Sequence, residues 1–89
     1  MGESITCVVA DDHPAMRAAV ADVLSDYGMT VLGAAADGEE AVERIEAARP
    51  QVAVVDVRMP VLSGIEVARR VAMTTPCTAV LLYTAYGDR

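Results

Sequence analysis

The segment QVAVVDVRMP, Gln51 to Pro60, decides the fold of this chain. Four apolar residues, Val52 to Val55, run directly into a single aspartate, Asp56. A short uninterrupted run of mostly β-branched residues predicts a strand that is buried on both faces, as central strands of parallel sheets are. Asp56 then lies at the carboxyl end of that strand, where open α/β sheets place their ligand sites. Such a carboxylate needs a compensating partner, because burying an isolated charge is costly.

The composition limits what the chain can bind. Its 89 residues are enough for one small domain, without Phe, Trp or lysine, and its formal net charge is −6. The core is therefore expected to consist of small aliphatic side chains. An acidic surface argues against direct binding of this segment to nucleic acid or to an anionic membrane. No apolar run approaches the roughly 18 residues of a membrane span, and we find no signal peptide, so a cytoplasmic location is expected.

Three more strands and three helices are predicted around the opening segment. Strands are expected at residues 5–10, 30–36 and 78–84, the second of them at a sheet edge because it carries a glycine and three alanines. The helices are expected to be capped by Asp12, by Asp37 with Glu40, and by Ser63 with Glu66. Gly28 and the Arg49-Pro50 pair would end the first two helices, and the Thr74–Pro76 segment would end the third.

The apolar spacing of each helix predicts which side chains it buries. The first helix is expected to bury Met16, Val20, Val23, Leu24 and Tyr27. The second is expected to bury Ala41, Val42, Ile45 and Ala48, and the third Ile65, Ala68, Val71 and Ala72. Cys7 and Cys77 are expected to be reduced core residues, with a disulfide as the alternative.

Strands that alternate with helices predict a parallel α/β sheet, whose strands all end at one rim. Asp11, Asp12, Asp56 and Thr84 follow or end three of these strands. Three carboxylates at one rim repel one another, and a hard divalent cation such as Mg²⁺ would resolve that repulsion. Asp56 could then act as a nucleophile toward a phosphoryl group, and the Thr84 hydroxyl could bind a phosphoryl oxygen. The simpler alternatives are a helix cap for Asp12 and a backbone cap for Thr84.

Two other features of the sequence bear on this site. Neither a P-loop pattern nor GxGxxG occurs, which weakens a nucleotide-binding interpretation. The lone His13 is interpreted as a solvated residue at the start of a helix, because hard cations prefer oxygen ligands.

Four pieces of the sequence resemble the receiver domain of bacterial two-component response regulators. They are VVADDHP, DGEEAV, PQVAVVDVRMPVLSGIEVARR and LLYTAY, at residues 8–14, 37–42, 50–70 and 81–86. The resemblance implies a flavodoxin-like, doubly wound parallel sheet with strand order 2-1-3-4, a cytoplasmic signalling role and Mg²⁺ as the cofactor. DDHP further resembles receivers that control a helix-turn-helix DNA-binding output domain and thereby regulate transcription.

The resemblance also implies a role for each residue at the rim. Asp56 would be the phosphoacceptor, supplied by a sensor histidine kinase, and Thr84 would be the switch hydroxyl. Mg²⁺ would be bound by Asp11, Asp12, Asp56 and the main-chain carbonyl of Arg58. The residues that shape the surrounding loops would be Pro60, Gly64 and Ala85. Since such a domain accepts the phosphoryl group on its own aspartate, it is not expected to be a turnover enzyme.

The chain departs from the family pattern after its fourth predicted strand. A receiver, a (βα)5 fold, usually continues with a helix, a fifth strand that ends in lysine and a final helix. Residues 1–89 are therefore expected to be an incomplete receiver domain. The fourth strand would then be an exposed sheet edge and one helix face would stay uncovered, so we expect a homodimer or another assembly through them.

Two other functions compete with phosphoacceptance. The receiver fold could be a scaffold for interaction or dimerisation that does not depend on phosphorylation. A phosphatase like the haloacid dehalogenases would also use Asp56 as nucleophile, but it needs a second acid two residues later, where this chain has Arg58.

Overall fold

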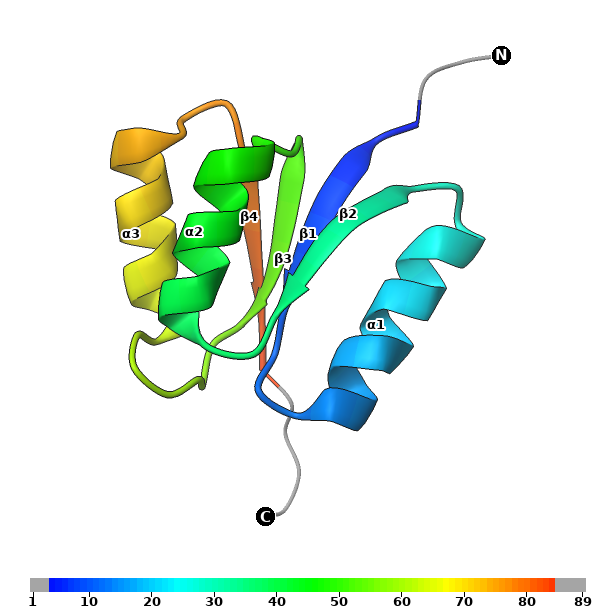
Figure 1. Cartoon of the computed structure of the whole chain (residues 1–89), viewed down its shortest axis with the longest axis horizontal. Helices are drawn as coiled ribbons and strands as arrows, with labels where there is room; N and C mark the ends of the chain where they lie inside the picture. The colour runs from blue at the N-terminus through cyan, green and yellow to red at the C-terminus, as the bar shows by residue number, and fades with distance from the viewer. Residues whose placement is uncertain (1–3, 85–89) are drawn as a thin grey trace.

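A computed structural model describes residues 4–84, in which strands and helices alternate along the chain (Figure 1). The strands are β1 (Thr6–Ala10), β2 (Thr30–Ala35), β3 (Val52–Asp56) and β4 (Ala79–Tyr83). The helices are α1 (Pro14–Asp26), α2 (Gly38–Ala48) and α3 (Gly64–Thr74). All strand pairs are parallel and the order is β2-β1-β3-β4, which confirms the predicted fold class, the inner position of β3 and the edge position of β2.

The main core lies between the sheet and the helices α2 and α3, which lie side by side on one face of it (Figure 1). The strands contribute alternate residues to this core, as a period of two requires. They are Val8 and Ala10 of β1, Ala35 of β2, and Ala53 and Val55 of β3. The helices contribute Ala41, Val42, Ile45, Val67 and Val71. As the lack of Phe and Trp predicts, the largest fully buried side chain is an isoleucine, Ile45.

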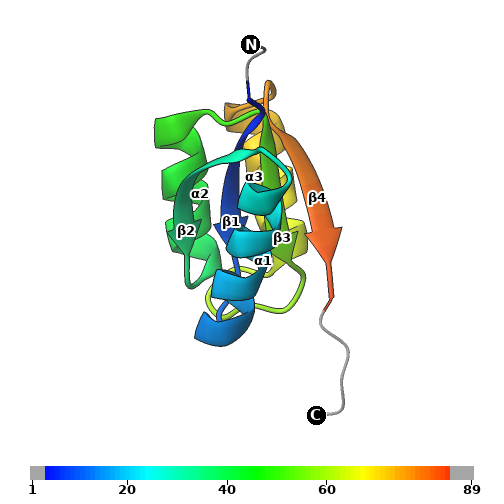
Figure 2. The same cartoon turned by 90° about the vertical axis from the view of Figure 1, so that its right-hand side faces the viewer.

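The opposite face of the sheet carries α1, which packs against β1 and β2. In Figure 2 this helix lies in front of the sheet while β4 runs beside it uncovered. None of the residues of α1 is buried, and Val23 and Tyr27 are 54% and 83% exposed. The predicted burial of Met16, Val23 and Tyr27 is therefore wrong, and Val20 and Leu24 are only half-buried. The apolar stripe exists, but within residues 4–84 no other element covers its outer side.

The buried sides of α2 and α3 also differ in part from the prediction. Ala48 is exposed, although the other three predicted residues of α2 are buried. In α3 the buried residues are Gly64, Val67 and Val71, whereas Ile65 is 47% exposed and Ala72 is exposed. Apolar residues occupy more than one side of α3, so spacing alone cannot say which side faces the sheet.

The helix starts follow the predicted capping signals in two of three cases, and the helices stop at the predicted C-terminal signals. Asp37 accepts the N–H of Glu40, and Ser63 and Glu66 form a reciprocal capping box. Gly28, at φ 90°, follows α1 and ends it. The N-cap of α1, however, is His13 and not Asp12, and within residues 4–84 no side chain caps this helix.

The two cysteines are free thiols in different surroundings, since Cys7 is buried in β1 and Cys77 is exposed. The expectation of a buried Cys77 is therefore wrong. Burial raises the pKa of the Cys7 thiol. Of the three helices among residues 4–84, none has the length and the hydropathy that crossing a bilayer requires.

Candidate functional site

The strand register aligns three side chains at one rim of the sheet. Ala10 of β1 lies beside Val55 of β3, so Asp11 and Asp56 are the next residues along both strands. Asp56 in turn lies beside Tyr83 of β4. Because side chains alternate between the two faces, all three point away from the α2–α3 core. The row Asp11, Asp56, Tyr83 therefore crosses β1, β3 and β4 on the α1 side of the sheet.

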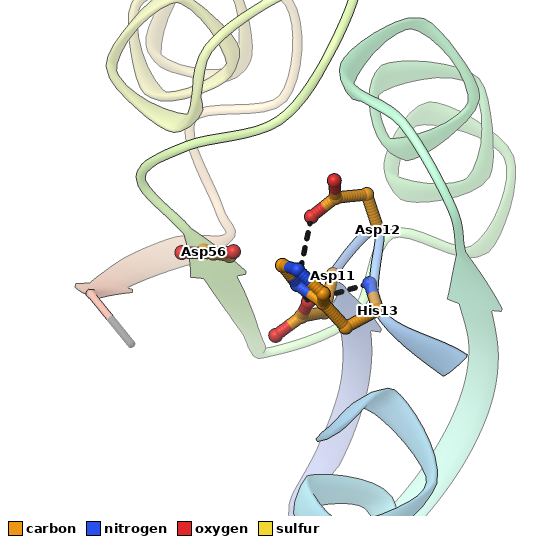
Figure 3. Close-up of side chains that lie close together, drawn as sticks. All are labelled: Asp11, Asp12, His13 and Asp56. Carbon is orange, nitrogen blue, oxygen red and sulfur yellow. Dashed lines mark hydrogen bonds and ion pairs between the residues drawn. The ribbon is translucent and has the colours of Figure 1, made fainter. Parts of the chain in front are cut away.

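Four side chains gather at this rim: Asp11, Asp12, His13 and Asp56 (Figure 3). One ligand atom from each lies within 4.8 Å of the others. The carboxylates of Asp11 and Asp56 are buried and Asp12 is half-buried, whereas 67% of the His13 side chain is exposed. The structure thus brings together the three acids that the strand-end pattern singled out.

Asp56 is in an environment that disfavours its charge. Burial raises the pKa of the Asp56 carboxyl, and the nearby Asp11 and Asp12 carboxylates raise it further. The backbone N–H of Arg58 donates to Asp56 Oδ1 at 3.3 Å and opposes this shift. An ionised Asp56 is therefore unfavourable here unless a cation balances it.

Asp11 is held by hydrogen bonds at both carboxylate oxygens. Its Oδ1 accepts the backbone N–H of His13 at 2.9 Å, and its Oδ2 accepts the hydroxyl of Tyr83. The main-chain carbonyl of Asp11 also accepts from the Arg17 guanidinium at 2.9 Å. Asp11 thereby connects β1 to the first turn of α1 and to β4.

Tyr83 is a member of the site that the sequence-based prediction missed. Burial and the Asp11 carboxylate both raise the pKa of its phenol. The available signal was an aromatic residue with a polar tip one position before the predicted end of a strand, next to strand-end acids. That signal becomes specific only when the register places Tyr83 beside Asp56.

Asp12 leaves one buried oxygen unsatisfied. Its Oδ1 has no hydrogen-bond partner within the described chain, although His13 Nδ1 lies 3.2 Å away (Figure 3). The same His13 nitrogen lies 3.3 Å from Asp11 Oδ1, so His13 is a solvated helix-start residue that also touches both acids. A buried oxygen without a donor, in a cluster of carboxylates, fits a hard divalent cation such as Mg²⁺.

The loop after β3 packs against the phosphoacceptor candidate. Gly64 is buried, and a Cβ there would overlap the carbonyl oxygen of Asp56. Pro60 accepts the N–H of Gly38 with its carbonyl, which joins this loop to the start of α2. Thr84 directly follows Tyr83 and is exposed, and Ala85 lies outside the described residues.

The chain is similar to known proteins in sequence and in fold. Residues 7–89 match the family model described as "Response regulator receiver domain". The chain is 44% identical over 88 residues to the protein-glutamate methylesterase/protein-glutamine glutaminase of Haloarcula marismortui. This match covers 99% of this chain and 24% of that protein. It is also 42% identical over 87 residues to the probable transcriptional regulatory protein NarL of Mycobacterium tuberculosis. That match covers 97% of this chain and 40% of the relative. The chain thus spans less than half the length of both relatives.

A solved structure agrees closely with the fold. The signal receiver domain of the putative response regulator NarL from Mycobacterium tuberculosis superposes with a TM-score of 0.90 at 41% sequence identity. The match covers 98% of this chain and 71% of that one. The parallel sheet and its strand order are therefore those of a solved receiver domain.

Proposed function

This chain belongs to the response regulator receiver domains, and we propose that Asp56 is its phosphoacceptor in a two-component phosphorelay. One observation carries the proposal: a buried carboxylate at the carboxyl end of an inner strand has two further carboxylates beside it. Family membership supports phosphorylation signalling in general, and this cluster supports Asp56 as the residue that accepts the phosphoryl group.

The reaction would transfer a phosphoryl group to the Asp56 carboxylate. A carboxylate oxygen attacks the phosphorus of a phosphohistidine on a sensor histidine kinase, the P–N bond breaks, and the leaving imidazole nitrogen keeps the electron pair and takes up a proton. The Arg58 N–H at Asp56 Oδ1 would keep the carboxylate oriented for attack. Since the phosphoryl group stays on the protein's own side chain, we propose an acceptor and not a turnover enzyme.

Mg²⁺ would be held by the carboxylates of Asp11, Asp12 and Asp56 and the main-chain carbonyl of Arg58. When bound, it supplies positive charge between the carboxylates and the phosphoryl oxygens. The unsatisfied Asp12 Oδ1 and the raised pKa of Asp56 both support a cation requirement. Thr84 would donate its hydroxyl to a phosphoryl oxygen, and the loop residues Pro60, Gly64 and Ala85 would shape the space beside it.

The test is phosphorylation by acetyl phosphate with Mg²⁺, followed by intact mass measurement. The wild-type chain should gain one phosphoryl group that is removed by hydroxylamine, whereas Asp56→Asn and samples with excess EDTA should gain none. Asp22→Asn is the matched control, because Asp22 is an exposed acid of α1 away from the cluster. Phosphorylation of Asp56→Asn to the wild-type level would refute the assignment.

We further propose that the protein to which this receiver domain belongs has a DNA-binding output and acts in the cytoplasm. The DDHP motif and the similarity to the NarL receiver domain support it. The chain has a comparable identity to a protein-glutamate methylesterase, so an output domain of that enzymatic kind is the alternative to DNA binding.

A second candidate, a phosphorylation-independent interaction module, is favoured by exposed apolar side chains. Leu81 of β4 is 59% exposed, and Met16 and Val23 on the outer side of α1 are 38% and 54% exposed. Sedimentation of the wild-type chain and of Asp56→Asn separates the two functions. The same stable oligomer in both proteins, with no phosphoryl uptake by wild type, would favour the module.

A further inference from the structure

We propose that Tyr83 is a positioning residue that holds the Asp11 carboxylate in place for a divalent cation and thereby couples β4 to the cation site. The inference rests on the proposed function, because it concerns the same cation. It adds a residue that no strand-end pattern had assigned.

The path of the Tyr83 side chain is the first argument. β3 lies between β4 and β1, and the residue beside Tyr83 in the register is Asp56. The hydroxyl nevertheless donates to Asp11, which follows β1 and lies 72 residues away in sequence. The phenol therefore spans the end of β3, and it joins an edge strand directly to an acid that the cation would need.

The second argument is how Asp11 is held. Its Oδ1 is fixed by the His13 N–H at 2.9 Å, and Tyr83 supplies the hydrogen bond to Oδ2 in the described chain. Without the phenol, the carboxylate would be held at one oxygen and could rotate. A carboxylate oxygen has two acceptor positions, so this bond leaves room for a cation on the same oxygen.

The expected size of the effect follows from other metal sites. Hydrogen bonds to ligating carboxylates orient them, and losing such a bond typically lowers metal affinity about 10–100-fold. A tyrosine that merely filled space would be replaced by phenylalanine without such a loss. Affinity for the metal therefore separates a positioning role from a packing role.

The test compares Mg²⁺ binding to wild type, Tyr83→Phe and Tyr27→Phe by isothermal titration calorimetry. Tyr83→Phe should raise the Kd for Mg²⁺ about 10–100-fold, while Tyr27→Phe, at an exposed ring on the end of α1, should leave it unchanged. The phosphorylation rate of Tyr83→Phe should recover at saturating Mg²⁺, which a folding defect would not do. Wild-type affinity in folded Tyr83→Phe would overturn the inference.

A second measurement does not require substitution of Tyr83. In the Tyr27→Phe, Tyr86→Phe background, Tyr83 is the one tyrosine left of three. Its fluorescence should change during a Mg²⁺ titration with the calorimetric midpoint, and an unchanged signal at saturation would overturn the inference. Failure of wild type to bind Mg²⁺ at all would refute the proposed cation site itself, which distinguishes the two failures.

Discussion

On one face of the sheet, α2 and α3 bury Ile45, Val67 and Val71 against β1 and β3; on the other face, α1 buries none of its residues. Both faces carry apolar helices, so the difference is not one of composition. It lies in coverage: α2 and α3 lie side by side and cover one another's flanks, whereas α1 has no helical neighbour among residues 4–84. Since burial of apolar area supplies most of the folding free energy, the α2–α3 face should dominate stability.

The largest expected effect tests this contrast directly. Ile45→Ala should lower the free energy of unfolding by about 2–5 kcal/mol, because Ile45 is fully buried in the α2–α3 core. Val23→Ala on α1 should change it by less than about 0.5 kcal/mol, because Val23 is mostly exposed. Urea unfolding measures both. Equal losses would mean that the outer side of α1 is covered in solution.

The next largest effect is expected at Gly64, where the start of α3 packs against the backbone of Asp56. Gly64→Ala should cost about 1–3 kcal/mol, because the new Cβ would overlap the Asp56 carbonyl oxygen and push α3 away from β3. Gly33→Ala is the control, since its Cβ would meet the Arg44 side chain at an ordinary 3.4 Å. Thermal unfolding should show a loss for Gly64→Ala alone; a harmless substitution there would mean that the loop is not tightly packed.

Charge at the rim is a separate limit on stability. Because the native pKa of Asp56 is raised, ionisation costs folding free energy, and stability falls as the pH rises through that pKa. Asp56→Asn should therefore melt higher than wild type at pH 7 without Mg²⁺, by about 4–8 °C for each kcal/mol relieved. The difference in melting temperature between Asp56→Asn and wild type should disappear below the ordinary Asp pKa of about 3.9.

Two controls accompany this measurement. Asp22→Asn should melt like wild type, because Asp22 is exposed, and Mg²⁺ should raise the melting temperature of wild type more than that of Asp56→Asn. A lower melting temperature for Asp56→Asn at pH 7 would contradict the electrostatic argument.

The smallest effect compares the helix starts. α3 begins with a capping box, in which Ser63 accepts the Glu66 N–H at 3.2 Å, whereas α1 lacks a side-chain cap in the described chain. Ser63→Ala should cost about 1 kcal/mol. Ser25→Ala, at an exposed position of α1, should cost less than about 0.5 kcal/mol. Equal effects in chemical unfolding would show that the cap of α3 contributes nothing.

The sequence predicts the fold well where patterns are unambiguous. The run Val52–Val55 ending at Asp56 correctly identifies an inner strand, and the rule that parallel strands end together correctly brings Asp11 and Asp12 to Asp56. The family resemblance adds the strand order. The structure bears on where these acids lie and not on what they do, so the roles of all the site residues, Thr84, Arg58 and Ala85 included, stay predictions.

The errors in helix burial have one physical origin, which is that spacing along a helix does not specify what packs against it. Tyr27 fits the apolar period of α1 but faces solvent, because no described element packs over it. In α3 the apolar spacing predicted burial of Ile65, but the side of the helix that packs into the core carries Val67. Asp12 has the right residue type for a cap, but His13 occupies that position.

The edge position of β4 has a kinetic consequence. β4 pairs with β3 alone in the described sheet, and β2, at the other edge, pairs with β1 alone. Edge strands are where local opening exposes amides to hydrogen exchange at the lowest free-energy cost. The Tyr83 hydroxyl ties β4 to the Asp11 carboxylate that would hold the cation, whereas β2 reaches Asp11 only through the backbone N–H, which donates to the Ala35 carbonyl at 3.0 Å. Binding of Mg²⁺ should therefore slow amide exchange in β4 more than in β2, so that one edge of the sheet reports occupancy of the site through its opening rate.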